Sequence, residues 1–127
     1  MSDTEAEQST TDGGSKAAAI SNAVVRLLSE YTGRGPTKAR THLTKDLVTV
    51  LLEQTLTKGE RSLVGDGKTD LVLSMRFAFQ QTMRDDLVTS VEQITGRQVA
   101  AFMSANHLDP DMAVESFVLV PERSDAA

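Results

Sequence analysis

The feature that most constrains the fold is a long series of apolar residues in the second half of the chain. They recur every three or four positions, which is the periodicity of one face of an α-helix. The series consists of Leu71, Met75, Phe79, Met83, Leu87, Val91 and Ile94. It predicts a helix from about Thr69 to Thr95 that ends at Gly96. A continuous apolar ridge on that helix needs a second layer of structure to cover it.

A second amphipathic helix is predicted near the start of the chain, from about Ser15. Its apolar residues also recur mostly at intervals of three and four, and they are Ile20, Val24, Leu27, Leu28 and Tyr31. Gly33 suits the left-handed cap that ends a helix, and Pro36 cannot continue one because proline has no N–H to donate.

Two β-hairpins and one short helix complete the predicted elements. Residues 37–43 alternate with period two, and residues 47–53 are rich in Val and Leu, so a turn at 44–46 joins two strands. Residues 98–104 and 112–120 form a second pair, joined by a loop at 105–111. Between the hairpins, residues 56–63 resemble a short helix with Thr57 at the N-cap and Glu60 three positions later, the spacing of a capping box.

The order helix, β-hairpin, short helix, long helix, β-hairpin predicts an α+β fold. Successive hairpins favour a four-stranded antiparallel sheet with the helices packed on one face. Residues 16–121 are predicted to form a single domain. Residues 1–15 are predicted to be a disordered acidic tail and residues 122–127 a disordered C-terminus, because both have almost nothing apolar to bury. The order of the strands in the sheet is left open.

Composition narrows the classes of function. Residues 17–121 carry 11 basic and 12 acidic residues, so the body is nearly neutral and gives no support to binding of nucleic acid. The four phenylalanines are expected mostly in the core, leaving no stacking platform; they are Phe77, Phe79, Phe102 and Phe117. No apolar run approaches the roughly 20 residues of a membrane span. We expect a cytoplasmic protein without direct membrane insertion.

The stretch Gly33-Arg34-Gly35-Pro36 raises the question of a phosphate-binding loop. Such a loop lies between a strand and a helix, so that the amides at the helix start point at the phosphate. Here the glycines follow a helix and lead into a strand, and no Lys-Ser or Lys-Thr follows them. A helix cap and the start of a strand explain Gly33 and Pro36, but they leave Arg34 without a role.

The most distinctive group of charged residues is Lys38, Arg40 and His42, on one side of the first predicted strand with Arg34 just ahead. Such a row could receive a carboxylate, a phosphate or bicarbonate. Charges on an edge strand also discourage aggregation, and a solvated outer face is the simpler interpretation.

A second polar row lies on the long helix at Arg76, Gln80 and Arg84. Ordinary surface pairing with nearby aspartates is the simpler expectation. Alternatively, Arg76 and Arg84 pair with acidic groups of a partner chain.

Residues able to perform catalysis are few. His42 and His107 lie on different elements, outside any metal-ligand motif, and the chain has no cysteine. Glu60 could be a buried base, but its spacing from Thr57 favours a capping role. We therefore expect no enzyme activity, no catalytic residue, no cofactor and no metal site.

Five segments, taken in this order over residues 18–121, resemble the MpsC-like family. They read YTGRGP, LTKGERSL, LVLSMRFAFQQTMR, ITGRQVAAFMS and AVESFVLVP. The positions that match the family's motif are Gly33, Arg34, Gly35, Pro36, Leu56, Thr57, Glu60, Arg76, Gly96 and Arg97. The family is named for a sodium-translocating, membrane-potential-generating system of bacteria, so the resemblance implies a cytoplasmic accessory protein linked to ion or bicarbonate uptake.

Taken together, these observations predict a non-enzymatic accessory or regulatory protein. We expect a homodimer that docks on a membrane transporter subunit and is peripheral to the membrane through that partner. The alternative is a sensor for a small anion or a nucleotide on the basic strand face, and a third class is an enzyme with Glu60 or His42 as base. The candidate residues for ligand or partner binding are Arg34, Lys38, Arg40, His42, Arg76 and Arg97.

Overall fold

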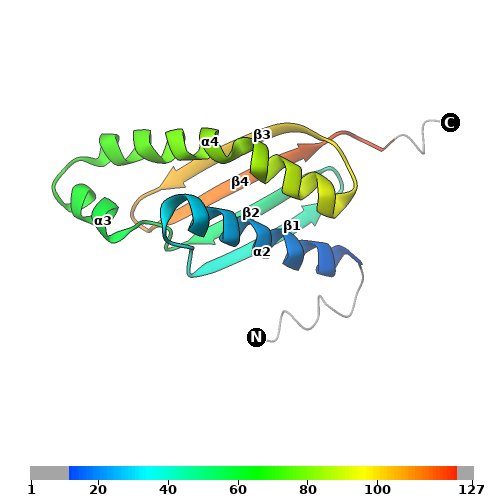
Figure 1. Ribbon diagram of the computed structural model, residues 1–127, viewed down its shortest axis with the longest axis horizontal. Coiled ribbons are helices and arrows are strands. Elements are labelled where there is room, and N and C mark those ends of the chain that lie inside the picture. The colour runs from blue at the N-terminus through cyan, green and yellow to red at the C-terminus, as the bar shows by residue number, and fades with distance from the viewer. Residues whose placement is uncertain (1–11, 123–127) are drawn as a thin grey trace.

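The computed structural model describes residues 12–122. In chain order its elements are α2 (Asp12–Thr32), β1 (Lys38–Thr44), β2 (Leu47–Glu53), α3 (Lys58–Gly65), α4 (Thr69–Thr95), β3 (Val99–His107) and β4 (Met112–Leu119) (Figure 1). This α+β order is the predicted one. The predictions of disorder for residues 1–11 and 123–127 lie outside the described residues.

The four strands form one sheet in the order β1-β2-β4-β3, and every neighbouring pair is antiparallel. The two hairpins are therefore joined through their second strands, with Leu51 of β2 in register with Val114 of β4. Consequently β1 and β3 are the two edges of the sheet.

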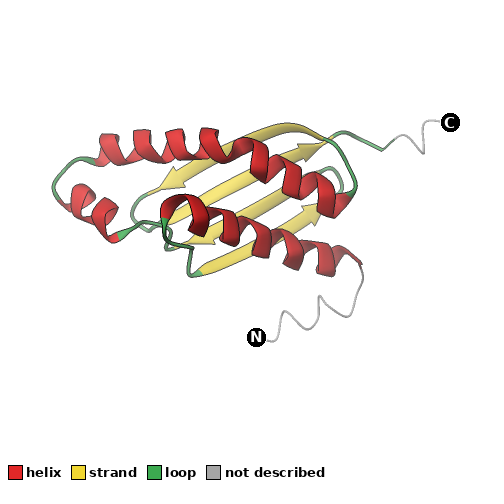
Figure 2. Cartoon of the chain, in the orientation of Figure 1, coloured by secondary structure: helices red, strands yellow, loops and turns green. Residues whose placement is uncertain are grey.

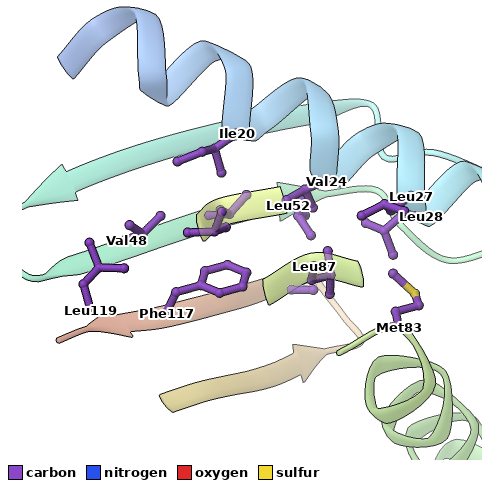
Figure 3. Close-up of a cluster of buried hydrophobic side chains, with 13 residues drawn as sticks. Ile20, Val24, Leu27, Leu28, Val48, Leu52, Met83, Leu87, Phe117 and Leu119 are labelled. Atoms are coloured by element: carbon purple, nitrogen blue, oxygen red, sulfur yellow. The ribbon is translucent and has the colours of Figure 1, made fainter. Parts of the chain in front are cut away.

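Helices α2 and α4 lie across the same face of the sheet, whereas α3 lies beyond its end and packs against α4 (Figure 2). Alternate residues of β2 and β4 are buried beneath the two long helices. Phe117 of β4 and Leu52 of β2 are fully buried there, opposite Leu87 of α4 and Val24 of α2 (Figure 3). This helix-facing layer is the hydrophobic core.

The element boundaries differ from the predicted ones in four main places, one of which is α3, found at Lys58–Gly65 instead of residues 56–63. Helix α2 begins at Asp12, before the predicted Ser15, and β1 runs one residue later than predicted. Strand β3 extends to His107, through the first part of the predicted loop. The extension has a physical cause: Asn106 and His107 remain in register with Ala113 and Met112 of β4, so backbone pairing continues to the hairpin turn.

The predicted apolar ridge on α4 is correct in its C-terminal half and wrong before that. The buried residues of α4 are Val72, Arg76, Gln80, Met83, Leu87 and Val91. Leu71, the first residue of the predicted ridge, is 50% exposed. A strict interval of four residues advances about 40° beyond a full turn at each step, so a line of such residues winds around the helix. The buried line runs at intervals of four, four, three, four and four residues, and the one interval of three turns it back by about 60°, which keeps it on one side.

The Gly-Arg-Gly-Pro stretch is the end of a helix followed by the start of a strand, as expected. Gly33 has a φ of 81°, and its N–H donates to the Ser29 carbonyl at 2.9 Å. Gly35 passes close to α2, since a Cβ there would lie 3.3 Å from Cγ1 of Val25. These contacts hold the chain against α2 as it turns toward β1.

Replacing Gly33 with Ala is expected to lower the free energy of unfolding by about 1 kcal/mol, because an L side chain is strained in the left-handed region. Urea denaturation measures the change. Gly65→Ala is the matched control, since Gly65 lies in α3 with open space around its Cα and an alanine there is expected to be neutral or slightly stabilising. Equal destabilisation by both substitutions would contradict the argument.

Candidate functional site

Three of the predicted binding residues, Lys38, Arg40 and His42, lie on the sheet face turned away from α2 and α4. Within residues 12–122, none of the three helices packs on this face. We call it the open sheet face. Its apolar side chains are Leu47, Leu51, Ala101, Met103, Ala105, Met112, Val114 and Val118. Leu47 is 41% exposed and Met103 is 54% exposed. An antiparallel sheet that faces water on one side normally carries polar residues there. Here the two central strands place only Thr49, Glu53 and Ser116 on this face beside their apolar side chains.

Rows of residues across the strands show how the open sheet face is organised. One row runs from Arg40 through Leu51 and Val114 to Ala105. The row from His42 differs, because it passes through Thr49 and Ser116 before it reaches Met103. The open sheet face therefore has apolar areas on its central strands, divided by this polar row, and a cationic border along β1.

The cationic border consists of Lys38, Arg40 and His42, all of which are exposed. It is partly neutralised, because Nη2 of Arg40 lies 3.4 Å from Oε2 of Glu53. Glu53 is also in register with Lys38. Lys38 and His42 have no ion-pair partner among the residues that the structure describes. The border thus presents the side chains of Lys38 and His42, unpaired within residues 12–122, and the guanidinium of Arg40, which is paired with Glu53.

Arg34 and Arg97 do not join this border. Nη2 of Arg34 donates to the carbonyl of Gln54 at 3.1 Å, which ties the segment after α2 to the end of β2. Arg97 donates to the carbonyls of Lys45 and Val120, each at 2.9 Å, and to Asp46 at 2.6 Å. The two arginines therefore lie at opposite ends of the β1–β2 hairpin, about 20 Å apart along the strands. The structure does not assemble one anion site from Arg34, Lys38, Arg40 and Arg97.

Arg76 is buried, contrary to the prediction of surface pairing. Its Nη1 lies 3.0 Å from Oε1 of Glu60, and both side chains are 6% exposed. The same guanidinium donates to the carbonyl and the hydroxyl of Thr55. Glu60 also accepts from the N–H of Thr57 at 2.8 Å, so the predicted capping box is confirmed and its carboxylate serves a second partner.

The ion pair is one of two hydrogen-bonded groups that we together call the buried polar network, made of Thr55, Glu60, Arg76, Gln80 and Glu115. The charge of Arg76 links the two groups, because it acts on the carboxyl of Glu115. Counted as whole residues, backbone included, all five are at most 5% exposed. Gln80 joins α4 to the sheet, because its amide exchanges two hydrogen bonds of 3.0 Å with Asn106 of β3 and lies 3.5 Å from Glu115 of β4. Beneath the N-terminal half of α4, the polar side chains of Arg76 and Gln80 occupy buried positions that apolar side chains would normally fill.

Asp111 extends the network to the β3–β4 turn. Its carboxylate accepts from the N–H groups of Thr55 and Leu56, at 3.0 and 2.9 Å, and from the Thr55 hydroxyl. Thr55 thus connects Asp111 on one side with Arg76 on the other. The segment between β2 and α3 is held by charges from two other parts of the chain.

Sequence reasoning missed Glu115, the most deeply buried charged residue. Burial raises the pKa of Glu115 to about 7, and hydrogen bonds from Ser104 and Gln80, with the nearby Arg76 charge, oppose that rise. A signal was present in the sequence: Glu115 alternates with Ala113, Phe117 and Leu119, so it had to share their buried face.

The remaining candidates form no further cluster. Among residues 12–122 no group of three or more His, Asp and Glu side chains is placed to hold a metal ion. His42 lies on the open sheet face and Glu60 in the buried polar network, so these two candidate bases do not meet. A shallow depression lies at Glu92, Gly96, Arg97 and Gln98, next to the guanidinium that holds the β1–β2 turn.

No helix in the described part of the chain has the length and apolar content that crossing a membrane requires.

Comparison with known proteins tests the resemblance to the MpsC-like family that the sequence indicated. No curated protein and no solved structure matches the chain. Residues 12–120 match the family model described as "Na+-translocating membrane potential-generating system (MpsC)". The match covers every helix and strand described above. The chain therefore belongs to the MpsC family, whose description associates it with a system that translocates Na+ and generates membrane potential.

Proposed function

We propose that this protein is a non-enzymatic, cytoplasmic accessory subunit that docks on a component of a Na+-translocating, membrane-potential-generating system. The family match supports the system, and the open sheet face supports docking as the mode of action. The resemblance seen in the sequence extends the proposal to ion or bicarbonate uptake by that system.

The observation that carries the proposal is that β4 has three apolar side chains on each face, with Glu115 and Ser116 as the polar exceptions. Ala113, Phe117 and Leu119 enter the core, while Met112, Val114 and Val118 lie on the open sheet face. Covering apolar surface releases about 25 cal/mol per Å². A partner that covers Val114 and its neighbours on the open sheet face gains this free energy without unfolding either protein.

The charges beside the apolar area indicate the chemistry of the partner. Lys38, Arg40 and His42 form a border on one side, and Glu53 is the only acidic residue of the four strands on this face. We propose that the partner presents an amphipathic segment with an apolar stripe for β2 and β4 and carboxylates directed toward β1. Such a pairing gives orientation as well as affinity, because charges at the border of an interface set register and speed encounter.

A substitution at the centre of the open sheet face tests this proposal. Val114→Glu places a carboxylate where the partner's apolar stripe would lie, and we expect it to lower co-purification with the co-expressed membrane components at least about tenfold. The readout is the ratio of membrane component to tagged protein after mild detergent extraction. Thr89→Glu, on the exposed side of α4, is the control and should retain the wild-type ratio. Undiminished co-purification of a folded Val114→Glu protein would reject the proposed surface.

The alternative function, a sensor of a small anion or a nucleotide, now depends on Lys38 and His42, because Arg34 and Arg97 are engaged by carbonyls of the chain itself. Thermal-shift measurements with bicarbonate, phosphate and nucleotides separate the two functions. The docking proposal expects no shift in melting temperature with any of them. A shift that disappears in Lys38→Ala would favour the sensor instead.

A further inference from the structure

Helix α4 carries an exposed stripe that neither the fold nor the open sheet face explains. We call it the α4 stripe, and it consists of Asp70, Leu73, Ser74, Phe77, Gln81 and Arg84, all of which are exposed. Phe77 is 61% exposed and Leu73 is 36% exposed. Intervals of three, four and seven residues place these positions on one side of the helix. This side flanks the buried line that contains Arg76 and Gln80, about a quarter turn around the helix from it.

A phenylalanine exposed to this degree is unusual on a surface that only meets water. Aromatic side chains are enriched in protein interfaces, where they act as anchors surrounded by polar residues. Phe77 has such surroundings, since Ser74 and Gln81 lie one turn away on either side and Asp70 and Arg84 lie two turns away. The α4 stripe therefore has the composition of a small interface centred on Phe77.

The charges of the α4 stripe are arranged symmetrically about Phe77. Asp70 lies seven residues before Phe77 and Arg84 lies seven residues after it. Seven residues are within about 20° of two full turns, so both charges lie almost directly in line with the ring. If an identical helix is laid antiparallel on this one with a two-fold axis at Phe77, each Asp70 faces the Arg84 of the other copy. Leu73 then faces Gln81, and the two Phe77 rings meet at the axis.

We propose that the α4 stripe is a homodimer interface in which a second copy of this chain packs antiparallel through Phe77. An interface between identical subunits related by a two-fold axis must be complementary to itself, and the order acid, aromatic, base along one helix meets this condition. A parallel pairing does not, because it places Asp70 against Asp70 and Arg84 against Arg84.

The local ion pairs leave both charges available for this contact. Asp70 has no ion-pair partner among residues 12–122. Arg84 lies 3.7 Å from Asp85, and with side-chain exposures of 47% and 95% that surface pair is weak. The stripe has one acid and one base, so it offers no net attraction to an anionic membrane or to an acidic protein. A second copy is the partner that uses both charges.

Charge reversal tests the proposal by sedimentation equilibrium over a range of concentrations. The wild-type chain is expected to self-associate. Asp70→Arg alone and Arg84→Asp alone are each expected to raise the dimer dissociation constant at least about tenfold, because each places like charges opposite one another twice. The double variant restores opposite charges and should return to within about threefold of the wild type. Gln93→Arg, exposed on the other side of α4, should dimerise normally.

Because the chain has no cysteine, a second measurement tests the position of the axis. A Phe77→Cys protein should form a disulfide-linked dimer under mild oxidation, whereas Gln93→Cys should form no disulfide cross-link within the dimer. Restoration by the double variant together with cross-linking at position 77 supports the proposal. A monomeric wild-type chain, single variants that dimerise as well as wild type, or a double variant that remains monomeric would overturn it.

The dimer proposal and the docking proposal fail separately. If self-association survives every change in the α4 stripe but is lost in Val114→Glu, the open sheet face joins the two copies and the α4 interface is wrong. If the α4 variants are monomeric and still co-purify with the membrane components, the dimer is correct and docking does not require it.

Discussion

Replacing Arg76 with Met is expected to lower the free energy of unfolding by about 3–5 kcal/mol. The substitution removes one member of a buried pair, so the Glu60 carboxylate loses its 3.0 Å partner while it stays 6% exposed. Thr55 loses its donors at the same time. Guanidinium chloride denaturation followed by circular dichroism measures the loss. The methionine stem fills much of the volume of the arginine, so the effect reports charge and hydrogen bonding more than a cavity.

Two comparisons identify the cause. Arg26→Met removes a surface pair with Glu30 at 3.9 Å, in which both side chains are about three-fifths exposed, and should cost less than about 1 kcal/mol. Adding Glu60→Leu to Arg76→Met removes the orphaned charge and should recover part of the loss, reduced by the lost cap at Thr57. If Arg76→Met costs no more than Arg26→Met, the buried polar network does not stabilise the fold as argued.

The second large effect is expected at Glu115 and depends on pH. Its pKa is raised to about 7 in the folded chain, against an ordinary value of 4.5, so the folded state binds the proton more tightly than the unfolded state. The stability that this proton provides is present at low pH and is lost as pH rises from about 4.5 through 7. The shift corresponds to about 3 kcal/mol in total.

Glu115→Gln is expected to remove this pH dependence, because the amide stays neutral and can still accept from Ser104 and Gln80. Above pH 7 the variant should be more stable than wild type by an amount approaching about 3 kcal/mol, and the two should converge near pH 4.5. Thermal denaturation across this range measures both curves. Glu30→Gln, on the exposed side of α2, should leave the wild-type curve unchanged. A variant curve parallel to wild type would show that folding does not raise the pKa of Glu115.

The order of the elements could be predicted because it depends on local periodicity and on end signals. The α4 boundaries at Thr69 and Thr95 follow from helical spacing and from Gly96, whose φ of 71° is the left-handed cap that the sequence indicated. The order of the strands could not be predicted in this way. It depends on which edges pair across the sheet, and the pairing of β2 with β4 joins residues more than 50 positions apart.

The roles of the arginines were predicted poorly for a related reason. Arg34, Arg76 and Arg97 bind the carbonyls of Gln54, Thr55, Lys45 and Val120, which lie 20 or more residues away in the chain. Nothing near an arginine in the sequence shows that a distant backbone oxygen will face it. The cationic border could be predicted, because alternation within β1 was enough to place Lys38, Arg40 and His42 on one face.

The two hydrogen-bonded arginines at the ends of the β1–β2 hairpin have a mechanical consequence for recognition. Arg34 follows α2 and Arg97 follows α4, so each helix end is fastened to one end of the hairpin that carries the cationic border. The hairpin cannot slide or tilt against the helical layer without breaking these bonds. A binding partner therefore meets a β1 strand that is already held in place, and little binding free energy is lost in ordering it.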